Sequence, residues 1–179
     1  MIRLFRIGYL VSVLTDLVQI RRLGEMKRDE NSRFRIYLKR HNYVERRLKK
    51  IGQEIEAQID CNTCANCCRV ATVEPTERDI DKLAKFLRIS RERFLSEYTT
   101  EGEPGKRILR QTGEGCVFLS GMDCTVYEER PRMCELFPHV VKGEGPITTR
   151  MWELVDRATY CPIVYNSLEA FKAETGFGR

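Results

Sequence analysis

The stretch Cys61-Asn-Thr-Cys64-Ala-Asn-Cys67-Cys68 decides how the rest of the chain must be arranged. Four thiols in eight residues leave no room for apolar side chains, and small polar residues fill the gaps. Four further cysteines follow at scattered positions: Cys116, Cys124, Cys134 and Cys161. We therefore expect the fold to bring these two groups of cysteines together.

The spacing within this stretch is typical of metal chelation. A Cys-x-x-Cys turn lets two thiolates point at one centre, about 2.3 Å from each sulfur in a zinc site. Here Cys61, Cys64 and Cys67 recur every three residues, and Cys68 is added. Such a group suits a zinc site and one corner of an iron–sulfur cluster equally well. The predicted metal ligands are Cys61, Cys64, Cys67, Cys68, Cys116, Cys124, Cys134 and Cys161. They are enough for two four-ligand sites, or for one site with the remaining cysteines structural.

Other uses of cysteine fit the pattern less well. An even number of cysteines also allows a disulfide framework, but a chain of 179 residues can bury a core without one. A thioredoxin-like pair lies between a strand and a helix, whereas this stretch follows a predicted helix. The Cys-x-x-x-Cys-x-x-Cys spacing of radical S-adenosylmethionine enzymes, the glycine-rich phosphate loop and the His-Glu-x-x-His motif are absent. With only His41 and His139, histidine-rich catalytic sites are excluded.

The N-terminal apolar run does not have the features of an export signal. The run from Ile7 to Ile20 follows two arginines, but Asp16 interrupts it and no small-residue cleavage site follows. It is also shorter than the roughly 20 apolar residues that span a bilayer. Chelating thiols without an export signal predict a reducing, cytoplasmic setting.

Charge divides the chain into two parts. Residues 1–50 carry 14 lysines and arginines against 5 acidic residues, whereas residues 51–179 carry 17 against 21. We therefore predict a basic, amphipathic helical arm over residues 1–57 and a cysteine-cluster metal-binding domain over residues 58–179.

Two helices are expected in and just beyond the arm. Residues 2–23 are mostly apolar with one polar stripe, Gly24 is the predicted helix stop, and residues 27–32 form a polar connector. A second helix is predicted over residues 33–60, where apolar residues step by three and four. The first helix needs a partner, which is the body of the domain, another protein or a membrane surface. The basic half of the second is most simply a solvated face, although such runs also follow nucleic acid.

After the cysteine stretch, helix starts and a hairpin are predicted. Thr76 is the expected N-cap of a helix with Asp79 in capping-box position, and Ser90 is the cap of the next helix. Residues 116–119 and 124–127 have the composition of two short strands that flank a turn.

The remaining elements are helical. Pro131 opens a turn or helix that carries Cys134, and a last helix runs through Leu168 and Phe171. The predicted fold class is α+β and mostly helical: a small β-hairpin plus helices around a multi-cysteine metal site, with a helical N-terminal arm.

A long compound motif resembles the YkgJ-type cysteine-cluster family. The matching stretches are Cys61-x-x-Cys64-x-x-Cys67-Cys68, Glu74-Pro75-Thr76 with Asp79-Ile80, Cys116-Val-Phe-Leu119, Cys124 to Pro138, and Cys161-Pro162. The likeness covers roughly residues 58–165, so the basic N-terminal segment lies outside it. The resemblance implies a zinc- or iron-chelating domain. Flagellin lysine N-methylases look related through the same cluster, and an iron–sulfur centre is attributed to that branch.

The resemblance leaves the biochemical role open between metal binding and catalysis. One hypothesis is a metal-binding protein whose metal site is structural or serves to handle metal or electrons. The alternative is a protein-modifying transferase that resembles the lysine N-methylases. Such methylases are longer than this chain. Arg130 is expected either to offset thiolate charge or to pair with a carboxylate. His139 is expected to be an ordinary turn histidine, a ligand or a support for the metal site.

Overall fold

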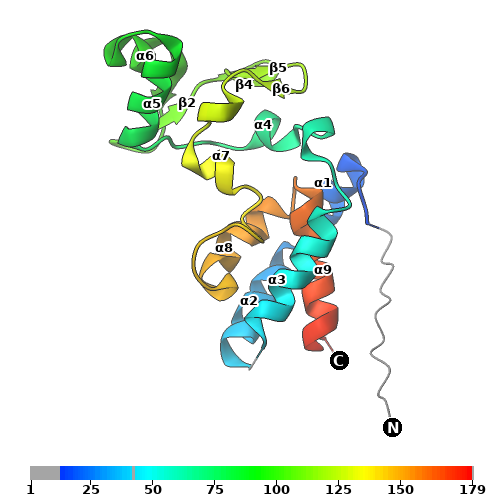
Figure 1. Cartoon of the computed structure of the whole chain (residues 1–179). Coiled ribbons are helices and arrows are strands. Elements are labelled where there is room, and N and C mark those ends of the chain that lie inside the picture. The colour runs from blue at the N-terminus through cyan, green and yellow to red at the C-terminus, as the bar shows by residue number, and fades with distance from the viewer. Residues whose placement is uncertain (1–12, 42, 179) are drawn as a thin grey trace.

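The computed structural model describes residues 13–41 and 43–178 and shows the predicted α+β, mostly helical fold. Figure 1 shows two halves, one built of α1, α2, α3, α8 and α9 and the other of α5, α6 and the strands, with α4 and α7 between them. The α-helices in the described residues are α1 (Leu17–Met26), α2 (Arg28–Arg40), α3 (Glu45–Glu56), α4 (Asn66–Val70), α5 (Glu77–Leu87), α6 (Arg91–Tyr98), α7 (Arg132–Leu136), α8 (Ile147–Arg157) and α9 (Pro162–Thr175). Two short 3₁₀ helices are η1 (Cys61–Thr63) and η2 (Tyr127–Glu129).

The strands form three antiparallel pairs. They are β1 (Thr99–Glu101) with β2 (Arg107–Leu109), β3 (Gln111–Thr112) with β4 (Gly115–Cys116), and β5 (Leu119–Ser120) with β6 (Asp123–Cys124). Each pair is too short to be stable alone, so the hairpins depend on the helices that pack against them.

One hydrophobic cluster, here called the helical core, joins the two ends of the described chain. Its fully buried members come mainly from α2, α3, α8 and α9 and include Phe34, Leu48, Leu154 and Phe171. The side chain of Lys172 on α9 forms an ion pair with Glu30 on α2. The division of the chain at residue 57 therefore stays a prediction, and the described residues on both sides of that boundary share one core.

A second cluster, here called the hairpin core, lies under the cysteine-bearing hairpins. Its buried members are Val73, Ile80, Leu83, Ala84, Phe94, Leu109, Phe118 and Val126. The predicted capping box at the start of α5 is confirmed, because Thr76 Oγ1 accepts from Asp79 N (3.1 Å) and Asp79 Oδ2 accepts from Thr76 N (2.9 Å). The predicted cap of α6 is confirmed as well, since Ser90 accepts from Arg93 N.

The N-terminal helices differ from the prediction in three ways. Residues 1–12 of the predicted helix 2–23 lie outside the described residues, and α1 begins only at Leu17 because Asp16 accepts a hydrogen bond from Gln19 N as an N-cap. The predicted connector over residues 27–32 is wrong, since α2 begins at Arg28. The predicted single helix over residues 33–60 is divided between α2 and α3.

Two glycines have a role that the sequence did not indicate. Gly24 is not a helix stop but lies inside α1, where an added Cβ would come within 2.5 Å of Ala158 O. Gly52 lies inside α3, where an added Cβ would come within 2.8 Å of Val140 Cγ1. Both residues lack a side chain so that a helix can approach its neighbour closely.

The predicted hairpin exists but is shorter, and Cys116 lies outside it. Cys124 pairs with Leu119 in the β5–β6 hairpin, whereas Cys116 pairs with Gln111 in the preceding β3–β4 hairpin. None of the described helices is both long and apolar enough to cross a membrane.

Candidate metal centre

The cysteine stretch is a sharply turned segment between α3 and the hairpin core. Asp60 Oδ1 accepts from Asn62 N at 2.9 Å and so starts η1 at Cys61. Ala65 then adopts a left-handed conformation (φ 46°), and α4 begins immediately after it. The four thiols therefore lie on two short helical turns that meet at an angle, rather than on one helix.

Four cysteines surround a small cavity, and we call them the compact set. They are Cys61, Cys64, Cys67 and Cys161, and the cavity of about 20 Å³ is otherwise lined mainly by apolar and aromatic side chains such as Ile59, Phe137 and Tyr160. Cys161 is buried at the N-cap of α9, 100 residues after Cys61. Tertiary folding thus brings Cys161 to the cysteine stretch, as the sequence predicts.

The other four cysteines line a larger cavity, and we call them the open set. They are Cys68, Cys116, Cys124 and Cys134, which come from α4, β4, β6 and α7. The cavity has a volume of about 420 Å³, and Cys61 and Cys67 also reach its wall. Convergence of Cys116, Cys124 and Cys134 on the cysteine stretch is therefore observed, although their role as ligands stays a prediction.

Backbone contacts on either side of α4 hold the two sets. Asn66 Nδ2 donates to the carbonyl of Tyr160 at 2.7 Å, which ties α4 to the residue before Cys161. On the other side, Arg69 donates to the carbonyls of Cys64 and Gly121, each at 3.0 Å. The sequence did not single out Asn66 or Arg69; Asn66 is one of the polar residues that occupy the gaps of the motif, and Arg69 directly follows its last cysteine.

Gly115 allows β4 to lie directly against α4. Its φ is 130°, and an added Cβ would come within 2.7 Å of both Arg69 Cα and Cys68 O. The absence of a side chain therefore brings Cys116 next to Cys68.

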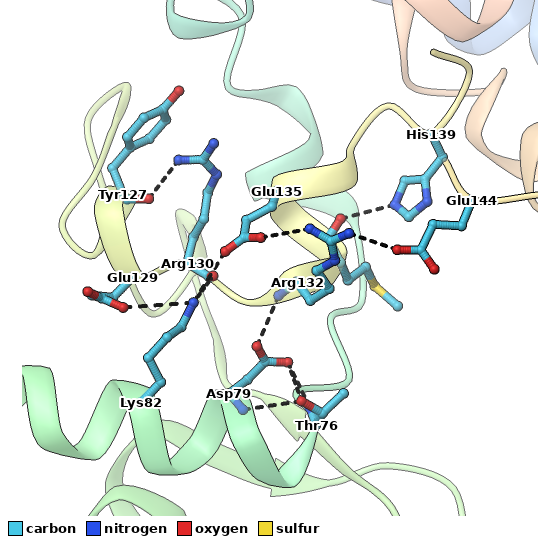
Figure 2. A network of polar contacts seen from close by, with 11 residues as sticks. Thr76, Asp79, Lys82, Tyr127, Glu129, Arg130, Arg132, Glu135, His139 and Glu144 are labelled. Carbon is cyan, nitrogen blue, oxygen red and sulfur yellow. Dashed lines mark hydrogen bonds and ion pairs between the residues drawn. The ribbon is translucent and has the colours of Figure 1, made fainter. Parts of the chain in front are cut away.

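A network of polar contacts fixes the segment that carries Cys134 (Figure 2). Asp79 Oδ1 accepts from Arg132 N at 3.0 Å, and Lys82 Nζ donates to the Arg130 carbonyl at 3.0 Å. At the other end of this segment, the His139 imidazole forms a hydrogen bond with the Met133 carbonyl, with Nε2 and the oxygen 3.0 Å apart. His139 thus supports the turn that bears Cys134, and its buried ring has a lowered pKa because of burial and the nearby Arg157.

Burial keeps most of these thiols protonated. It raises the pKa of Cys161 to about 12, and it raises the pKa of Cys134 to about 12 with a further rise from Cys116. Cys68 differs, because a hydrogen bond with the Cys67 thiol lowers the pKa of Cys68 to about 7. Metal binding at the buried thiols would release protons, since thiolates are the ligands.

Cationic side chains lie around the thiols and offset the charge that thiolates would bring. Arg69 is next to Cys68, and Arg130 partly offsets the rise in the pKa of Cys124 and Cys134. The Arg130 guanidinium stacks on the Tyr127 ring at 3.9 Å and, among the described residues, forms no ion pair with a carboxylate. This placement agrees with the charge-offset hypothesis for Arg130.

The donor chemistry fits a soft metal, but the thiols are not drawn together around one. All eight cysteines are free, with no disulfide among them. Within residues 13–41 and 43–178, no three histidine, cysteine or acidic side chains are close enough to hold an ion as they stand. The side chains of each set would therefore have to converge on binding, as is usual where ligation and local ordering are coupled.

Comparison with known proteins identifies the family. Residues 60–162 match the model of the CxxCxxCC family, which is described as "Putative zinc- or iron-chelating domain". The chain belongs to this family. The match begins beside Cys61 and ends beside Cys161, so it contains all eight cysteines of the two sets. Membership supports metal binding and leaves the choice of zinc or iron open.

One relative comes from Methanocaldococcus jannaschii and is named Uncharacterized protein MJ0661. It is 32% identical over 112 residues, which are 59% of this chain and 57% of that protein. This chain thus spans a little over half the length of that relative. No solved structure matches the chain significantly. None of these three comparisons links the chain to the flagellin lysine N-methylases.

Proposed function

We propose that this protein binds zinc or an iron–sulfur cluster through all eight cysteines, as a structural metal site or for metal or electron handling. One observation supports this most strongly: Cys116, Cys124, Cys134 and Cys161 all come to the walls of two cavities that the 61–68 stretch also lines. Packing alone rarely groups eight free thiols, because a buried cysteine behaves as a small apolar residue and needs no partner of its own kind.

The electrostatics of the site agree with this proposal. Four thiolates around a divalent ion carry a net charge of −2, which is costly to bury without nearby cations. Arg69 and Arg130 are such cations. A reducing, cytoplasmic location is part of the proposal, because it would keep the thiols available.

Anaerobic purification followed by metal and acid-labile sulfide analysis tests the proposal. We expect at least one metal atom per chain, with sulfide and a broad visible absorption band if the group is an iron–sulfur cluster, and a colourless zinc protein otherwise. Less than one metal atom per chain in the reduced protein would reject the proposal. A chain with Cys64 and Cys124 both changed to alanine is the control, since it lacks one thiol of each set.

The size of the larger cavity supports a second candidate, a protein-modifying transferase of the lysine N-methylase kind. A volume of about 420 Å³ lies within the range of small-molecule sites, roughly 300–1,000 Å³, and exceeds what one ion needs. Tyr127 and Arg130 on its wall offer a ring and a charge to a ligand. Calorimetry with S-adenosylmethionine tests this candidate, and absence of binding to the metal-loaded protein would set it aside.

A further inference from the structure

We propose that the eight cysteines form two separate four-thiolate sites, the compact set and the open set, which meet at Cys67 and Cys68. This inference rests on the proposed function and deepens it, because it assigns each thiol to one site. It also assigns a different bound group to each site. The compact set binds a single divalent ion, and the open set binds either an ion or a larger group.

The cavities carry the first part of the argument. Every cysteine of the compact set lines the smaller cavity, and no cysteine of the open set does so. Every cysteine of the open set lines the larger cavity, whose wall Cys61 and Cys67 of the compact set also reach. The four thiols that are absent from the smaller cavity thus come from four different elements, and the larger cavity is where they meet.

The helix geometry of α4 explains why two adjacent cysteines serve different sites. Successive residues of an α-helix are rotated by about 100°, so Cys67 and Cys68 leave the helix in different directions, although their thiols are still close enough to share a hydrogen bond. Cys64 ends η1, and the left-handed residue Ala65 separates it from α4, but the thiols of Cys64 and Cys67 both line the smaller cavity. The backbone of α4 at Cys68 packs against β4 at Gly115, and Cys68 lines the larger cavity together with Cys116 and is absent from the smaller one.

The cysteines that come from outside the 61–68 stretch pack in different hydrophobic cores. Cys161 is a member of the helical core. Cys116, Cys124 and Cys134 all pack against the hairpin core. The Asn66–Tyr160 hydrogen bond ties α4 to the segment that carries Cys161, whereas Arg69 ties α4 both to Gly121, beside the open set, and to Cys64 of the compact set. Figure 1 shows α4 between the two halves of the molecule, where it would connect the two sites.

The two cavities differ in size, and they therefore have room for different bound groups. About 20 Å³ is close to the space that one water molecule needs, roughly 10–15 Å³, so the compact set has room for one ion and little else. Four thiolates around one small ion match the closed tetrahedral arrangement of structural zinc sites. The larger cavity continues past the open set to Arg130 and Tyr127, so that site has space for a bigger group beside the thiols.

The test uses the full chain, reduced and stripped of metal without oxygen, with Zn²⁺ alone as the probe. Bound ions are counted by mass spectrometry under native conditions, and helix content is followed by circular dichroism.

Cys64→Ala removes a thiol of the compact set, and Cys124→Ala removes one of the open set. Both residues are partly exposed, so neither change opens a large internal cavity. Cys161→Ala and Cys134→Ala are second variants of the same sets, and Gly113→Ala is the control, because nothing lies within 4 Å of an added Cβ there.

We expect two zinc ions in the unchanged chain and in Gly113→Ala, one in Cys64→Ala, one in Cys124→Ala and none tightly bound in the double variant. A chain that holds metal as purified but takes up fewer than two zinc ions overturns the two-site proposal and leaves the proposed function standing. Loss of both ions from either single variant with helix content unchanged also overturns it, since that result indicates one shared centre. A chain without metal as purified and without zinc uptake removes both proposals.

Discussion

Asp79, at the start of α5, accepts a hydrogen bond from the backbone N–H of Arg132 at 3.0 Å, although 53 residues separate the two in sequence. The carboxylate is buried, and its other oxygen caps α5 through Thr76. One side chain therefore closes the first turn of one helix and fixes the first turn of another, the helix that bears Cys134 (Figure 2).

Asp79→Ala should destabilise the protein by about 2–4 kcal/mol, because it removes a helix cap and leaves a partly buried N–H unpaired. Urea unfolding of the reduced, metal-free chain measures this loss. Thr76→Ser keeps the capping hydroxyl and should cost less than about 1 kcal/mol. The same Asp79 variant should bind zinc more weakly at the open set, since α7 would no longer be held. Equal stability of the Asp79 variant and the unchanged chain would contradict this role.

Gly115→Ala should weaken metal binding at the open set. The new Cβ would collide with the α4 backbone at a φ that L-residues rarely adopt, and such strain costs about 1–3 kcal/mol before the collision is counted. Separation of β4 from α4 would move Cys116 away from Cys68. Zinc competition with a chelator measures the loss. Gly113→Ala, two residues away in an open position, should bind as the unchanged chain does, and similar affinities for the two variants would refute the close-approach argument.

Lys172→Met should reduce the dependence of stability on pH between about pH 6 and pH 4. Lys172 Nζ lies 2.5 Å from Glu30 Oε1 and 2.7 Å from Glu169 Oε1. The hydrogen bond from Lys172 holds the pKa of Glu30 below its usual 4.5. The Glu30 carboxyl therefore releases its proton more readily in the folded state than in the unfolded state. The resulting stabilisation is present above the unfolded pKa and is lost as the pH falls.

Urea midpoints at pH 6 and pH 4 on the metal-free chain check this prediction. The drop between the two pH values should be smaller in Lys172→Met, and smaller again in Glu30→Gln, which removes the titrating group. An unchanged drop in both variants would show that the pair is not a source of acid sensitivity.

Phe171→Ala should cost about 3–5 kcal/mol, because the ring is fully buried in the helical core between elements from both ends of the described chain. Trp152→Ala, at a side chain that is 60% exposed, should change stability by no more than about 0.5 kcal/mol. Thermal or urea unfolding distinguishes the two. If the helices of the N-terminal arm were an independent unit, Phe171→Ala would leave their unfolding unchanged.

Local sequence signals predicted local structure well. The capping box of Thr76 and Asp79 and the cap at Ser90 involve residues three apart, so a single window of sequence contains the whole interaction. The helix opened by Pro131 is of the same kind, since proline sets the backbone of one turn. Predictions failed where long-range packing determines the conformation. Gly24 has the composition of a helix end, but the approach of α1 to the backbone near Ala158 explains it, and that contact joins residues more than 130 apart.

The sequence alone determined the chemistry of this protein: eight thiols, four of them in a chelating motif that is encoded by spacing and needs no knowledge of the fold. Only the tertiary structure decided which thiols face one another. Two helices meeting at Ala65, a glycine that lets β4 touch α4, and two hydrophobic cores on either side of α4 divide the cysteines into a compact and an open set. The ability of a cysteine to bind metal is a property of that residue alone. Which cysteines lie together depends on contacts between segments up to 100 residues apart in the sequence, and these contacts form only when the two cores pack.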